Sequence, residues 1–110
     1  MTQNDYKYAV VDLEATGTGS SAKIIQIGIV LIENGIITKA YETDVNPHEE
    51  LDEHIKELTG LDDERLGRAP EFSQVAAEVY ELIQDAIFVA HNVKFDANLL
   101  AEALFWEGFD

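Results

Sequence analysis

One turn signal constrains the fold of this 110-residue chain more than any other feature. Asn34 and Gly35 separate residues 23–33, a strand-like run rich in isoleucine and valine, from residues 36–45, which form a second strand-like run. Asn-Gly between two such runs is a strong hairpin signal, because both residues readily adopt the positive φ of a tight two-residue turn. The sequence therefore predicts an antiparallel hairpin, and with it a β-sheet.

Two further apolar runs lie outside this hairpin. Residues 6–13 are mostly apolar, which is typical of a buried central strand. Residues 86–90 have the length and composition of a short buried strand. We expect both to join the hairpin in one sheet.

Apolar residues at helical spacing predict the helices. A first helix covers residues 51–58 and ends before Gly60, a further turn covers residues 62–66, and Asn92 is the N-cap of a helix over residues 93–106. The order β-β-β-α-α-β-α indicates an α/β fold with a mixed sheet, three antiparallel strands followed by an αβα unit. The most regular helical stripe lies between these helices and consists of Phe72, Val75, Ala76, Val79, Leu82 and Ile83.

The charge limits the classes of function. Twenty-two acidic residues against seven basic ones give a formal net charge of −15, which argues against a broad basic groove for nucleic acid. The charge still allows an enzyme that holds phosphates through divalent cations. There is no cysteine, and the first residues lack the segments of a signal peptide, so we expect a cytoplasmic protein.

Two carboxylates interrupt the first predicted strand near its end. Asp12 and Glu14 are two positions apart, so they point to the same face, about 7 Å apart along the strand. Neither has an obvious basic partner nearby in the sequence. The ordinary explanation is a solvated pair in a loop, and the alternative is a pair of metal ligands.

A third carboxylate falls in the last predicted helix. Leu99, Leu100 and Ala103 lie three, four and seven residues after Asp96, which places Asp96 on or beside the buried stripe. It lies either solvated at the edge of the first turn, or buried at a cost of several kcal/mol. Divalent cations bound between the three acids would explain them together, because two metals about 3.5–4 Å apart are the usual means of displacement at phosphate.

Four segments resemble one protein family, in the same order along the chain. VVDLEATGTG, residues 10–19, is similar to the first motif of the DnaQ-like (DEDD) 3′–5′ exonucleases, and FVAHNVKFDANLL, residues 88–100, to the second. KIIQIGIVLIENGII resembles the hairpin of that family, and ELTGLDDERLGRAPEF the loop and helix that follow it. The resemblance is nearest to the N-terminal exonuclease domain of DinG-type helicase-exonucleases, with DNA polymerase III epsilon-like proteins more distant.

This resemblance implies a fold, a reaction and residue roles. The fold would be ribonuclease H-like, and the reaction would be hydrolysis at the 3′ end of a single-stranded nucleic acid, with DNA favoured. Asp12, Glu14 and Asp96 would be catalytic and would bind two divalent cations, Mg²⁺ or Mn²⁺. A helicase or polymerase, in the same or another chain, would be a partner. The residues around the terminal nucleotide would be Leu13, Ala15, Thr16 and Gly17.

The sequence departs from the family at its third motif, which would supply a general-base His or Tyr and a fourth Asp. Residues 1–110 would then be the N-terminal two-thirds of one exonuclease domain, truncated at its C-terminus, with weak or no activity. We expect His91 to be packed rather than a ligand, and His48 and His54 to be solvated. A sheet that lacks its last strand would also offer an edge for self-association.

Two other functions fit parts of the sequence. A non-catalytic acidic interaction module of a larger DNA-processing protein would explain the charge and the missing third motif. A dinucleotide-binding fold is disfavoured, because residues 17–19 lack the third glycine and a hairpin follows where a helix is required.

Overall fold

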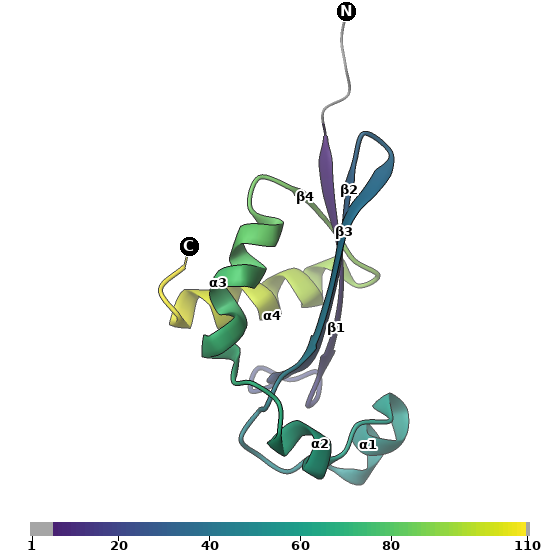
Figure 1. Ribbon diagram of the computed structural model, residues 1–110. Coiled ribbons are helices and arrows are strands. Elements are labelled where there is room, and N and C mark those ends of the chain that lie inside the picture. Colours follow the sequence, from purple (N-terminus) through teal and green to yellow (C-terminus); the bar gives the residue numbers. More distant parts are fainter. Residues whose placement is uncertain (1–5, 110) are drawn as a thin grey trace, which may run out of the picture.

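The computed structural model describes residues 6–109, which form one four-stranded mixed sheet with helices against it (Figure 1). The strand order is β3-β2-β1-β4; β2 runs antiparallel to both β1 and β3, whereas β4 lies parallel to β1. The predicted α/β fold with a mixed sheet is confirmed. The elements are β1 (Lys7–Ala15), β2 (Ile24–Glu33), β3 (Ile36–Asp44), α1 (Glu53–Thr59), α2 (Asp63–Gly67), α3 (Phe72–Ile83), β4 (Ile87–Val89) and α4 (Val93–Trp106).

The hairpin of β2 and β3 turns where the sequence predicts it. Asn34 and Gly35 have φ values of 54° and 77°, in the left-handed region that a two-residue hairpin turn needs. β1 pairs with β2 on the side opposite β3 and with β4 only as far as Val10, so β1 is a central strand at its start and lies at the edge of the described sheet where it carries its two carboxylates.

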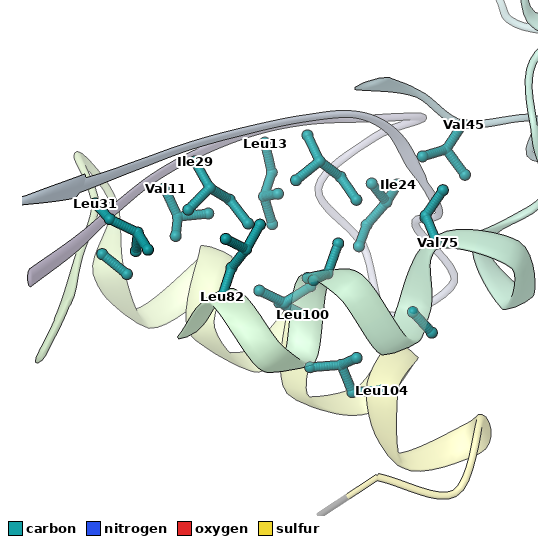
Figure 2. Packing of buried hydrophobic residues seen from close by; sticks show 14 residues of the cluster. Val11, Leu13, Ile24, Ile29, Leu31, Val45, Val75, Leu82, Leu100 and Leu104 are labelled. Carbon is teal, nitrogen blue, oxygen red and sulfur yellow. The ribbon is translucent and has the colours of Figure 1, made fainter. Parts of the chain in front are cut away.

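The core fills the space between the sheet and the helices α3 and α4 (Figure 2). Val11 and Leu13 of β1 and Ile29 of β2 point toward Leu100 and Leu104 of α4. Burying a side chain of this size contributes about 1.5–3 kcal/mol to folding stability. The burial of Val11 and Leu13 therefore determines which face of β1 packs against the helices. The predicted stripe of α3 packs into the same core, with four of its residues buried, namely Val75, Ala76, Val79 and Leu82.

A second, smaller cluster holds α1 and α2 at the end of the sheet where β1 finishes (Figure 1). Each of these short helices has an Asp N-cap: Asp52 accepts from the N–H of Ile55 at 2.9 Å, and Asp62 from that of Arg65 at 2.8 Å. The caps stabilise the starts of the two helices, and the cluster packs them against Ile25 of β2. The buried members of the cluster are Ile25, Leu51, Ile55, Leu61 and Leu66.

One prediction of burial is wrong, that of the strand at residues 86–90, and one apolar residue of the first helical pattern is exposed. Leu58 is 70% exposed, because α1 begins only at Glu53 and turns Ile55 alone toward the sheet. The predicted buried strand is β4, which lies at the edge of the described sheet, with Ile87 and Val89 44% and 39% exposed. Within residues 6–109, none of the helices combines the length and hydropathy that crossing a bilayer requires.

Candidate active site

Asp12 and Glu14 lie on the face of the sheet opposite the core. Their neighbours Val11 and Leu13 are buried in the core, so the alternation of a strand turns the two carboxylates the other way. Gly28 is the cross-strand partner of Asp12 on β2. Because glycine has no side chain, the face is hollowed there, and a cavity of about 370 Å³ is lined by Asp12 and Gly28 among others.

Asp96 reaches the same region from α4. β4 ends at Val89, which pairs with Val10, so no described strand covers the edge of β1 beyond that point. α4 begins soon after β4 and contacts β1, and Asp96 lies in its first turn. Asp96 is only 7% exposed, so the interpretation of this residue as a solvated acid at the helix edge is wrong.

The three carboxylates influence one another electrostatically. Burial raises the pKa of Glu14 above its usual value, and the charges of Asp12 and Asp96 raise it further. Burial also raises the pKa of Asp96, Asp12 adds to this effect, and His91 opposes it. Asp96 is therefore close enough to Asp12 and Glu14 for the charges to influence one another. In the part of the chain that the structure describes, none of the three carboxylates has a hydrogen bond or an ion pair.

The donor set suits a hard divalent cation, because Mg²⁺ and Mn²⁺ prefer carboxylate oxygens. Among residues 6–109, no group of three His, Cys, Asp or Glu side chains has the spacing of a formed metal site. Without a cation between them, the three carboxylates repel one another. A cation between Asp12, Glu14 and Asp96 would replace that repulsion with binding.

The residues predicted around the terminal nucleotide occupy the end of β1 and the loop after it. Leu13 is buried in the core, so only its backbone is available to a ligand, along the stretch of β1 that β4 leaves unpaired. Ala15, Thr16 and Gly17 are half-buried. Thr16 closes the loop: its N–H donates to the Lys23 carbonyl and its Oγ1 accepts from the Lys23 N–H, each at 2.9 Å. The hydroxyl proton of Thr16 stays available to an acceptor.

The histidine predictions are partly right. His91 is exposed rather than packed, and it lies near enough to Asp96 to lower the pKa of that carboxyl. His48 and His54 are exposed as predicted, and His48 Nε2 hydrogen-bonds Glu71 Oε1 at 2.8 Å. Asn92 begins α4 as predicted, but its side chain makes no capping hydrogen bond.

Sequence reasoning missed a polar row beside Glu14. Gln26 is the cross-strand partner of Glu14, and Asp44 is the partner of Gln26 on the next strand. The available signal was the single polar side chain at Gln26 in the apolar run IIQIGIVLI. The pairing register that brings it to Glu14 comes only from the folded sheet.

Comparisons with known proteins agree with this geometry. Residues 9–108 match the RNase T family model, described as exonuclease. The 3′–5′ exonuclease DinG of Staphylococcus aureus (strain USA300) is 45% identical over 97 residues, which cover 87% of this chain and 11% of that protein. This chain therefore spans about a tenth of the length of that relative.

Two solved structures share the fold. E. coli exonuclease I in complex with a dT13 oligonucleotide has a TM-score of 0.83 at 14% identity, covering 96% of this chain and 25% of that one. The nuclease domain of 3′hExo, a DEDDh family member bound to rAMP, has a TM-score of 0.76 at 17% identity, covering 99% of this chain and 64% of that one. The match over residues 9–108 shows that the chain belongs to the RNase T family of DnaQ-like exonucleases.

Proposed function

We propose that this chain carries the metal-binding part of a 3′–5′ exonuclease that removes nucleotides from the 3′ end of single-stranded nucleic acid, DNA in preference to RNA. The observation that carries the proposal is the electrostatic proximity of buried Asp96 to Asp12 and Glu14, three acids from two elements whose carboxylates form no ion pair among the described residues. A cluster of this kind costs folding free energy unless a ligand neutralises it.

In this proposal Asp12, Glu14 and Asp96 hold two divalent cations, Mg²⁺ or Mn²⁺. Bound cations of this kind activate an attacking water and stabilise charge at the phosphate. The chain itself would position the terminal nucleotide with the backbone at Ala15 and the hydroxyl of Thr16. The rigid pairing of β1 between β2 and β4 would keep these groups in register with the acids.

The remaining parts of the proposal concern the wider protein. The sequence holds no third motif of the family, so we expect the 110-residue chain alone to bind metal weakly and to hydrolyse DNA slowly or not at all. The structural relative with a bound dT13 oligonucleotide supports a single-stranded substrate. A helicase or polymerase partner, self-association at the edge beside β4, and a cytoplasmic location belong to the same proposal.

The first test measures metal binding without requiring turnover. Adding Mn²⁺ or Mg²⁺ is expected to raise the melting temperature of the native chain, because a ligand that binds only the folded state stabilises it by about 2.7 kcal/mol at 100 times its dissociation constant. Asp12→Ala should remove this gain. Glu102→Ala, an exposed acid on α4, should retain it. If neither metal changes the melting temperature of the native chain, the proposal is contradicted.

The second test concerns the substrate. A 5′-labelled single strand of DNA and an RNA of the same sequence are incubated with this chain and with a version extended by about 70 residues of the parent protein, a length taken from typical domain size. The extended chain should shorten the DNA from its 3′ end, more slowly for RNA, and only with metal present.

An acidic interaction module is the second candidate. The net charge of −15 and the absence of a formed three-ligand site among the described residues favour it. The melting experiment separates the two, because a module without a metal site should respond alike in native and Asp12→Ala chains.

A further inference from the structure

A row of polar side chains crosses the open face of the sheet next to the three acids. Glu14, Gln26 and Asp44 are successive cross-strand partners on β1, β2 and β3, and directly opposed residues in antiparallel strands have Cβ atoms about 4.5–5.5 Å apart. Arg65 of α2 lies at the end of this row and binds Asp44. Its Nε donates to Asp44 Oδ2 at 2.6 Å and its Nη2 to Asp44 Oδ1 at 3.0 Å.

Asp44 determines which way the carboxamide of Gln26 faces. Gln26 Nε2 lies 3.0 Å from Asp44 Oδ1, and an ionised carboxylate can only accept, so the amide nitrogen is turned toward β3. Burial opposes ionisation of Asp44, but the hydrogen bonds from Arg65 and Gln26, together with the charge of Arg65, keep its pKa below the usual value. Asp44 is thus a fixed acceptor, and the amide nitrogen of Gln26 is held to it.

The oxygen of the same carboxamide is then the atom left for another partner, and Glu14 on β1 is the cross-strand neighbour of Gln26 on the side away from β3. No hydrogen bond within residues 6–109 uses this oxygen. Gln26 is half-buried at the base of the open face, so its position is set by the sheet rather than by solvent. The amide oxygen of Gln26 is therefore a neutral acceptor next to Glu14. The Asp44–Arg65 pair, which lies outside the acid site, holds the amide nitrogen of the same side chain.

We propose that Gln26 is a positioning residue of the metal site, whose amide oxygen accepts a hydrogen bond from a hydrated divalent cation held by the three acids. This inference rests on the proposed function. A carboxamide suits the place because it adds an acceptor without adding a fourth negative charge. Partners of this kind, next to the direct ligands, commonly change metal affinity by 10–100-fold.

The test titrates Mn²⁺ into the 110-residue chain at a fixed temperature and records the half-saturating concentration from the heat of binding. Gln26→Leu keeps the bulk of the side chain and removes the oxygen, so it should raise this concentration about tenfold. Asp44→Asn leaves Gln26 intact but no longer dictates its orientation, so a smaller rise is expected. The double variant should behave like Gln26→Leu alone, because both changes act through one oxygen.

The matched control is Thr38→Ala, which removes another side-chain hydrogen bond of the same sheet, from Thr38 Oγ1 to Glu33 Oε2 at 2.6 Å. It should leave the half-saturating concentration unchanged. The opposite outcome is that Gln26→Leu and Asp44→Asn lower the melting temperature in EDTA and keep the half-saturating concentration of the native chain. In that case the row is purely structural, and this inference is overturned while the proposed function stands. If the native chain does not respond to Mn²⁺, the proposed function is overturned with it.

Discussion

Asp96 is the residue at which stability and function are in conflict. It lies in the first turn of α4, where the helix dipole favours an anion and the charge of His91 lowers its pKa, yet burial and the charge of Asp12 still leave that pKa raised. Its raised pKa means that the folded chain holds the proton more firmly than the unfolded chain does. Folding stability without metal should therefore fall as the pH rises above the unfolded pKa of this carboxyl.

Replacing Asp96 by its neutral isostere tests this conflict. Asp96→Asn is expected to raise the melting temperature in EDTA at pH 7–8, by the equivalent of about 1 kcal/mol, because it removes a buried charge that Asp12 repels. The gain should shrink toward low pH, where the native carboxyl is itself protonated. The same variant should lose the stabilisation by Mn²⁺. Thermal melts over a pH series check both effects, and a lower melting temperature in EDTA at pH 8 would contradict the prediction.

At the scale of elements, the short helix α2 is tied to the sheet by one ion pair. Arg65 bonds both oxygens of Asp44, and its side chain is 50% exposed, so solvent weakens the pair. Despite burial, the hydrogen bonds from Arg65 and Gln26 keep the pKa of Asp44 below its usual value. The pair therefore contributes stability above the unfolded pKa of Asp44, and that stability is lost as the pH falls through the lowered pKa.

Arg65→Ala should accordingly destabilise the chain only slightly at neutral pH. The difference from the native chain should vanish in acid, below the ordinary range of an aspartate. Urea unfolding at several pH values, followed by circular dichroism, measures it. Arg68→Ala is the control, since Arg68 makes only an exposed contact of 3.6 Å with Glu64 and should change stability little at any pH.

Elements with a local signal could be predicted from the sequence. The hairpin depends on Asn34 and Gly35, and α3 on its own apolar stripe, so both were placed correctly. The exposure of Leu58 and the edge position of β4 could not be predicted from the sequence, because each depends on which distant element packs over that part of the chain. In the site, the common face of Asp12 and Glu14 follows from alternation within one strand.

The proximity of Asp96 to that pair, in contrast, does not follow from the pattern of any one segment. The helical pattern left Asp96 either solvated or buried, and only the family motif joined it to the first strand. The physical reason for the meeting is the early end of β4, which frees the edge of β1 for the first turn of α4. The row that begins at Gln26 was missed because cross-strand register is not a property of any one segment.

At the scale of the whole molecule, a net charge of −15 must be reconciled with an anionic substrate. The described basic residues near the site are few: Lys23 beside Thr16, already paired with Glu49 at 3.3 Å, and Lys94 in the first turn of α4. When lysines and arginines provide most of the binding to a nucleic acid, its affinity falls steeply as the salt concentration rises. For single-stranded nucleic acid, the slope of log affinity against log salt concentration is about −0.7 per phosphate neutralised. This chain has the composition of a protein that relies on divalent cations instead.

Substrate binding should therefore depend on divalent metal far more than on lysine and arginine contacts. With a fluorescent oligo-dT strand and saturating Mn²⁺, the slope of log affinity against log NaCl concentration is expected to be shallow, about −1.5 or less in magnitude, since at most about two phosphates meet a basic side chain. EDTA should abolish binding at every salt concentration, because uncompensated acids then face the phosphates. Fluorescence anisotropy measures both, with Asp12→Ala as the metal-site control. A slope of about −4 that persists in EDTA would mean that a basic groove binds the strand and that the three acids do not govern recognition.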